Sequence, residues 1–168
     1  MLLKRAIHIM ALCFVAGGME ISASPLQKIA DDEFMLPSAA LACVRQQPAE
    51  YEISTRMNPF YLRGDFDGDG RMDYAILLRE KHSAKEGVLV CESATRRSML
   101  IGAGKRVILQ GTHSTDDLVD FNVWMVKERG SVAGIRSQGE FLYLEKRESG
   151  SGVFYRKGGK YLWLQLGE

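Results

Sequence analysis

The sequence predicts an α+β fold that is mainly β, with an antiparallel sheet of about six strands behind one N-terminal helix. Short apolar runs separated by turn residues recur after residue 50, and only residues 36–47 have helical spacing. The 168 residues are 46% hydrophobic and 26% charged, which is typical of one globular domain. The 22 basic residues are balanced by 21 acidic ones, so the composition excludes a strongly basic nucleic-acid-binding protein.

The first residues have the pattern of an export signal. Lys4 and Arg5 precede an apolar stretch from Ala6 to Met19, and small residues follow it. This pattern is typical of a secretory signal peptide, and the stretch is shorter than the ~20 residues that span a bilayer. We expect cleavage to remove residues 1–23 and leave residues 24–168 as a single periplasmic or secreted domain without a membrane span. The alternative is an uncleaved anchor or a helix of the fold.

Export would also decide the state of the cysteines. Cys13 lies within the expected signal peptide, so Cys43 and Cys91 are the pair that remains. Two cysteines in an oxidising compartment are candidates for a disulfide. The alternative is two buried free thiols, because cysteine is also common in protein cores.

One helix is expected at the start of the domain. Apolar residues at Leu36, Ala40, Cys43 and Val44 fall on one helical face after a start at Pro37-Ser38. Pro48 limits this helix, because the residue before a proline avoids helical backbone angles.

Strands are expected in the remainder of the chain. Gly158-Gly159 can adopt the positive φ angles of a type I′ turn, which predicts a hairpin before the alternating leucines of residues 161–166. The other candidate strands are short apolar or aromatic runs. They are Tyr74–Leu78, Val88–Cys91, Val107–Leu109, Phe121–Val126, Phe141–Leu144 and Val153–Tyr155.

An acidic loop leads into the expected central strand at Tyr74–Leu78. Four carboxylates so close together repel one another unless a cation balances them. Their spacing, with glycine at the sixth position, is that of the first nine positions of an EF-hand-type calcium loop, in which a backbone carbonyl also serves as a ligand. The predicted Ca²⁺ ligands are Asp65, Asp67, Asp69, the backbone carbonyl of Arg71, and Asp73.

The loop differs from an EF-hand, because Ile76 occupies the position of the bidentate glutamate and a strand follows in place of a helix. The string from Gly64 to Ala75 resembles the calcium loop of FG-GAP and VCBS-type repeats, and the whole chain resembles small exported bacterial proteins that carry this loop once. The resemblance implies a structural calcium ion bound by the five residues above. It implies no propeller, which needs at least four blades. The alternative is a solvated acidic turn that takes no metal.

No catalytic set emerges from the sequence, so we expect a non-enzymatic module stabilised by Ca²⁺. After residue 23 the only histidines are His82 and His113, and neither belongs to a nucleophile or zinc motif. The alternative function is a cell-envelope binding or inhibitor protein that meets a protein or glycan through its C-terminal hairpin. The residues of that possible partner face are Tyr155, Arg156, Lys160, Tyr161 and Trp163.

Overall fold

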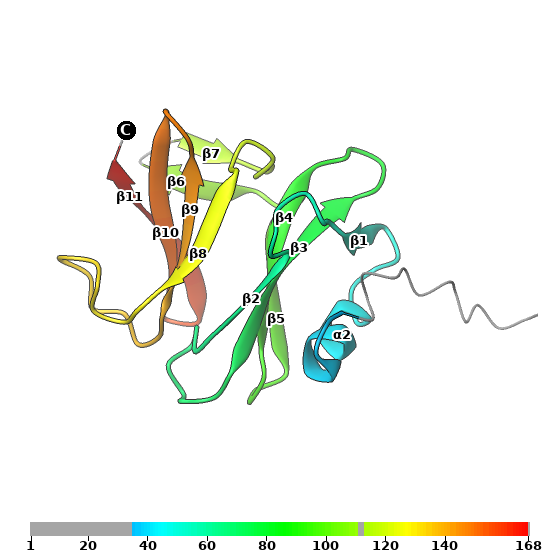
Figure 1. The fold of residues 1–168 in the computed structure, drawn as a ribbon, viewed down its shortest axis with the longest axis horizontal. Helices are drawn as coiled ribbons and strands as arrows, with labels where there is room; N and C mark the ends of the chain where they lie inside the picture. Colours follow the sequence, from blue (N-terminus) through cyan, green and yellow to red (C-terminus); the bar gives the residue numbers. More distant parts are fainter. Residues whose placement is uncertain (1–34, 111–112, 168) are drawn as a thin grey trace, which may run out of the picture.

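The structure is a computed structural model that describes residues 35–110 and 113–167. The expected signal peptide, residues 1–23, lies outside the described residues. Within them the chain forms one helix and eleven strands (Figure 1). The elements are α2 (Ser38–Val44), β1 (Tyr51–Ile53), β2 (Tyr61–Gly64), β3 (Asp73–Glu80), β4 (Glu86–Glu92), β5 (Arg97–Gly102), β6 (Val107–Gln110), β7 (His113–Thr115), β8 (Val123–Lys127), β9 (Phe141–Lys146), β10 (Gly150–Lys157) and β11 (Lys160–Gly167).

The strands form two larger antiparallel sheets and one small hairpin. In the first sheet, β3 pairs with β4 on one edge and with both β1 and β2 on the other, and β5 follows β4. The second sheet has the order β11-β10-β9-β8, and β6 pairs with β7 alone. Figure 1 shows the two larger sheets facing each other as a sandwich. In the described part of the chain, no helix is long and apolar enough to cross a membrane.

The main core lies between the two sheets. Alternate residues of β3 and β4 point into it, since successive side chains of a strand project from opposite faces. Ala75, Leu77, Val88 and Val90 from the first sheet belong to one buried cluster with side chains of the second sheet. The contributors from the second sheet are Trp124, Leu142, Leu144 and Phe154.

The outer faces of both sheets are also covered. Helix α2 covers the first sheet, where Leu36 and Ala40 form a cluster with Ile76, Leu78 and Leu89. On the outer face of the second sheet, Val132 and Ile135 from the segment between β8 and β9 pack with residues of β9 and β10. Because the middle of β3 is buried on both faces, residues 74–78 form an unbroken apolar run and lack the alternation of a one-sided strand.

The predicted mainly β, antiparallel class with a single short helix is confirmed in the described residues, and β3 is an inner strand as expected. The helix begins at Ser38 and ends before Pro48. The hairpin turn at Gly158-Gly159 has positive φ at both residues. The described residues form more strands than the six expected, and these strands are divided between separate sheets. Apolar runs in the sequence indicate buried strands, but they do not indicate the sheet to which each strand belongs. Short or polar strands such as β1, β2 and β7 have no such run.

Candidate metal centre

The acidic loop, residues 65–72, connects β2 to β3. Its base is closed by the antiparallel pairing of Gly64 with Asp73, the first residue of β3. The aromatic ring of Phe66, between the first two aspartates, is fully buried in the core between the sheets. Burial of this ring contributes about 2–3 kcal/mol and holds the loop against the sandwich.

Three of the four predicted carboxylates come together. Oxygen atoms of Asp65, Asp67 and Asp73 all lie within 4.8 Å of one another. Asp69 is exposed and does not belong to this cluster, and its Oδ1 accepts a hydrogen bond of 2.7 Å from the backbone N–H of Arg71. Three converging carboxylates suit a hard divalent cation, which binds oxygen ligands.

Backbone hydrogen bonds hold the first carboxylate of the cluster in place. Asp65 Oδ1 accepts from the N–H of Gly68 at 2.8 Å, and its Oδ2 accepts from the N–H of Gly70 at 3.0 Å. Asp67 Oδ1 accepts from the N–H of Asp69 at 3.1 Å. These bonds fold the loop back on its own side chains, as short polar residues do in turns.

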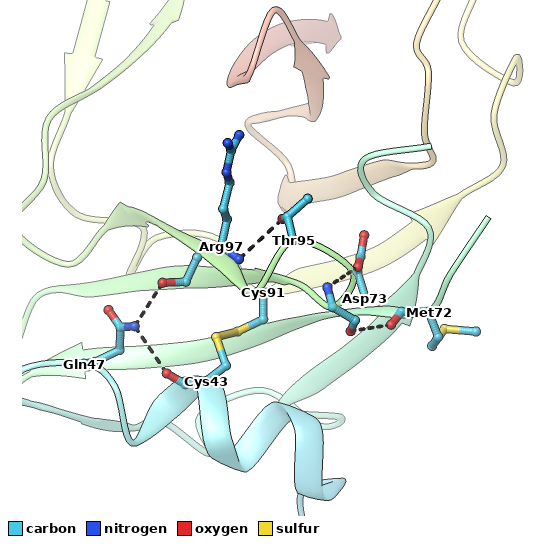
Figure 2. Close-up of a disulfide and its surroundings, with 9 residues drawn as sticks. Cys43, Gln47, Met72, Asp73, Cys91, Thr95 and Arg97 are labelled. Atoms are coloured by element: carbon cyan, nitrogen blue, oxygen red, sulfur yellow. Dashed lines mark hydrogen bonds between the residues drawn. A yellow bond between two sulfur atoms is a disulfide. The ribbon is translucent and has the colours of Figure 1, made fainter. Parts of the chain in front are cut away.

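Asp73 is the buried member of the cluster. Its Oδ2 accepts from the N–H groups of Phe66 and Asp67, at 3.1 and 3.4 Å, and its Oδ1 accepts from the N–H of Ser93 at 2.8 Å. Figure 2 shows Asp73 beside Met72, whose carbonyl accepts a hydrogen bond from the Ser93 hydroxyl. Burial raises the pKa of Asp73 to about 6, although the backbone N–H groups act in the opposite direction.

The segment that leads into β9 of the second sheet contacts the loop from outside. Glu140, just before β9, accepts the N–H of Asp65 through Oε2 at 2.7 Å and donates its own N–H to the Asp65 carbonyl at 2.7 Å. A Cβ atom at Gly139 would lie 2.4 Å from the carbonyl oxygen of Phe66, so only glycine permits this approach. The acidic loop, which connects two strands of the first sheet, is therefore also bound to the segment that leads into the second sheet.

Gly68 and Gly70 together test the contact between the acidic loop and the segment before β9, because only Gly68 lies against that segment. Both have φ of +82°, but a Cβ at Gly68 would lie 2.3 Å from the Gln138 carbonyl oxygen, whereas a Cβ at Gly70 would meet nothing within 4 Å. We expect Gly70→Ala to lower the free energy of unfolding by about 1–2 kcal/mol through backbone strain alone. Gly68→Ala should lower it by about 2–5 kcal/mol, because the clash adds to the strain. Urea denaturation in the presence of a chelator measures the free energy of unfolding of each variant. Equal losses in the two variants would show that the loop does not pack against residue 138.

A buried ion pair lies beside the acidic loop. Arg156 on β10 binds Glu92 at the end of β4 through two hydrogen bonds, and so joins the two sheets. Burial raises the pKa of Asp67, and the charges of Asp69 and Glu92 raise it further, whereas Arg156 lowers it. The Glu92–Arg156 pair as a whole does not neutralise the loop, because Glu92 affects the pKa of Asp67 more than Arg156 does.

The five residues of the predicted partner face are divided between the two sides of the hairpin. Tyr155 is buried in the outer cluster of the second sheet, whereas Trp163 packs against the core between the sheets. Arg156 is engaged by Glu92, and Lys160 is exposed at the turn. Tyr161 packs against the inner core, and its buried hydroxyl has no hydrogen-bond partner in the described part of the chain. Burial raises the pKa of this phenol.

The two cysteines form a disulfide that ties the helix to the sheet. Cys43 in α2 is bonded to Cys91 in β4, with Cα atoms 6.2 Å apart (Figure 2). Gln47 strengthens the junction, since its side-chain amide donates to the Cys43 carbonyl and to Ser98 Oγ. Ser93, which holds Asp73, lies two residues after Cys91, so the disulfide and the acidic cluster share one end of β4.

Sequence reasoning missed the residues that support the cluster from other elements. Ser93, Glu140 and the Glu92–Arg156 pair are far from the loop in sequence and belong to no local motif. Of these residues, only Glu92 could have been singled out from the sequence. It directly follows the apolar run of the predicted strand at Val88–Cys91, and a glutamate buried there needs a partner.

Comparison of this chain with protein-family models, with curated proteins and with solved structures finds no match in any of the three. The likeness to FG-GAP and VCBS-type loops therefore rests on the acidic loop alone.

Proposed function

We propose that this protein is an exported, non-enzymatic β-sandwich module that Ca²⁺ stabilises by binding in the Asp65–Asp73 loop. The observation that carries the proposal is the convergence of the Asp65, Asp67 and Asp73 carboxylates within 4.8 Å. A divalent ion would balance their mutual repulsion and would be bound by oxygen atoms, as Ca²⁺ prefers. Magnesium fits less well, because it retains its water ligands and binds few protein groups.

The position of the loop gives the ion a structural role. Asp65 is held by Glu140, just before β9 of the second sheet, and Asp73 is held by Ser93, just after β4. An ion that joins Asp65 to Asp73 would therefore link three segments of the sandwich. Because Ca²⁺ binds the folded state, its binding free energy adds to the free energy of unfolding by mass action.

Export is supported by two features. The signal-like pattern of residues 1–23 is one, and the Cys43–Cys91 disulfide is the other, since disulfides persist mainly in oxidising compartments. The alternative partner face on the C-terminal hairpin receives less support. Tyr155 lies on the opposite side of the sheet from Trp163, and Arg156 is already paired with Glu92.

Thermal unfolding with and without calcium tests the proposal. With the Kd of about 10⁻⁴–10⁻³ M typical of extracellular modules, about 10 mM Ca²⁺ should raise the melting temperature of chelator-treated protein by about 4–10 °C. Asp67→Asn should abolish this rise, because it removes a charge from the cluster while keeping the oxygen that accepts the Asp69 N–H.

Two variants serve as controls. Asp120→Asn removes an exposed carboxylate outside the loop and should keep the full rise. Asp69→Asn should keep most of it, because Asp69 lies outside the cluster. The proposal fails if calcium leaves the melting temperature of the parent unchanged, or if Asp67→Asn responds to calcium as the parent does.

A further inference from the structure

The Cys43–Cys91 disulfide borders an open cavity where the helix meets the first sheet. The cavity has a volume of about 330 Å³ and lies between α2 and the β4–β5 turn. Both bridged cysteines belong to its lining, together with the small side chains of Ala39 and Ala42. This volume is at the lower end of the range for small-molecule sites, so the cavity admits a small molecule to the disulfide and excludes a folded protein.

The two cysteines of the bridge differ in accessibility. Cys91 is 4% exposed and belongs to the buried cluster beneath α2, whereas Cys43 is only partly buried. In thiol–disulfide exchange a thiolate attacks one sulfur of the bridge and the other sulfur leaves, and access helps to select the sulfur that is attacked. Attack from the cavity therefore falls on Sγ of Cys43, with Cys91 as the leaving group.

The side of the cavity at the β4–β5 turn is basic. Arg96 and Arg97 line it and are exposed, and in the described part of the chain neither guanidinium group has an ion-pair partner. Glu92 also lines the cavity, but its carboxylate is bound to Arg156. Figure 2 shows the Arg97 side chain directed away from the disulfide, so it acts through its electric field and not by contact. A positive field of this kind concentrates anions at the entrance of the cavity.

We propose that Cys43 is a site of thiol–disulfide exchange with a small thiol that carries carboxylate groups. The thiolate of the small molecule attacks Cys43 Sγ, the Cys43–Cys91 bond breaks, and Cys91 leaves as a thiolate that takes a proton from water. The product is a mixed disulfide between Cys43 and the small thiol. A second molecule of the thiol attacks this mixed disulfide, which releases the small molecule as its own disulfide and leaves Cys43 as a thiolate that is protonated by water. The two molecules of thiol supply the two electrons of the reduction.

Exchange at Cys43 would release α2 from the first sheet. The helix has seven residues and no side-chain cap at its N-terminus, and Ala40 is its one buried residue. The residues beneath it, Ile76, Leu78 and Leu89, are fully buried, so release of the helix uncovers an apolar face. Hydrogen exchange of the α2 amides should therefore accelerate when Cys43 carries the small thiol. An adduct in which α2 exchanges as slowly as in the bridged protein overturns this consequence.

Mass spectrometry of native, bridged protein treated with millimolar reduced glutathione tests the site of attack. The reaction is run in chelator, since neither cysteine belongs to the acidic cluster and the exchange does not depend on calcium. Acid stops the exchange at successive times by protonating the thiolates. Peptide mapping should place glutathione on Cys43 and a free thiol at Cys91. Glutathione on Cys91, or complete reduction without an adduct on Cys43, overturns the proposal.

The rate at which the bridge opens shows whether attack occurs in the folded protein. Urea concentrations below the unfolding transition should leave this rate nearly unchanged, because the cavity already gives access to Cys43. If attack required unfolding, the rate would rise with the population of unfolded molecules. Such a rise, or a bridge that stays intact until the protein unfolds, overturns the proposal.

Removal of the two cavity charges tests the class of thiol. Arg96→Gln combined with Arg97→Gln should slow the reaction with glutathione about threefold more than the reaction with 2-mercaptoethanol, which has no carboxylate, and added salt should reduce this difference. Arg136→Gln is the matched control, because Arg136 is exposed between β8 and β9 and its replacement should change neither rate. Circular dichroism confirms that each variant is folded. Equal slowing of the two thiols by the double variant, or no slowing of either, overturns the assignment of a carboxylate-bearing thiol.

Discussion

Replacement of both bridged cysteines, Cys43→Ala with Cys91→Ala, is expected to lower the free energy of unfolding by about 4 kcal/mol. The disulfide joins residues 48 positions apart, and the chain-entropy model gives about 4 kcal/mol for a loop of that length. Helix α2 has seven residues, too few to be stable alone, and Ala40 is its one fully buried side chain. Loss of the bridge should therefore also release the helix from the first sheet.

Urea denaturation measures the loss, and hydrogen exchange locates it. Exchange should accelerate in α2 and on the outer face of the first sheet, whereas β9 and β10 should change little. Reduction of the parent should reproduce the loss, and reduction of the double variant should have no effect. An unchanged urea midpoint in the double variant would contradict this account of the helix.

Asp73→Asn is expected to lower the free energy of unfolding by about 1–3 kcal/mol in chelator, and by about 1–3 kcal/mol more at about 10 mM calcium, because the variant also loses a carboxylate of the proposed site. The buried carboxylate accepts three backbone N–H groups through its two oxygens, and an asparagine replaces one of those oxygens with an NH₂ group. At least one buried N–H then faces a donor and loses its partner, which costs about 1–3 kcal/mol for each group so affected. Asp69→Asn is the control within the loop and should change stability little, because Asp69 is exposed and keeps its acceptor oxygen.

The same residue should make the metal-free protein sensitive to pH. Because burial raises the pKa of Asp73 from 3.8 to about 6, the folded state binds this proton more tightly than the unfolded state. The resulting stabilisation is present in full below pH 3.8 and is lost as the pH rises through about 6. In the presence of a chelator, the difference in the free energy of unfolding between the parent and the less stable Asp73→Asn variant should therefore increase as the pH falls from 7 to 4. A difference that decreases over this range would contradict the raised pKa.

The sequence predicted those parts of the molecule that depend on local patterns. The hairpin at Gly158-Gly159 and the helix that starts at Ser38 each follow from a few neighbouring residues. The spacing of the acidic loop, with glycine at its sixth position, was enough to place Asp65, Asp67 and Asp73 together. The spacing also predicts Asp69 as a ligand; in the structure Asp69 lies outside the cluster of three carboxylates, and its Oδ1 accepts the N–H of Arg71.

Features that depend on the packing of distant segments were not predictable. The division of the strands into two facing sheets depends on pairings such as β2 with β3, and β2 has no continuous apolar run. Glu140 lies 75 residues after Asp65 in the sequence, and the contact between them arises only when the second sheet closes over the loop. The glycines at positions 68 and 139 allow that contact, but their sequence context resembles that of any turn.

Isothermal titration of calcium into chelator-treated protein tests the central claim most directly, with Asp67→Asn titrated in parallel. We predict that one Ca²⁺ binds per chain with a Kd of about 10⁻⁴–10⁻³ M, and that the variant gives no binding heat over the same range. Absence of binding heat in the parent, or equal binding by parent and variant, would contradict a calcium site built from Asp65, Asp67 and Asp73.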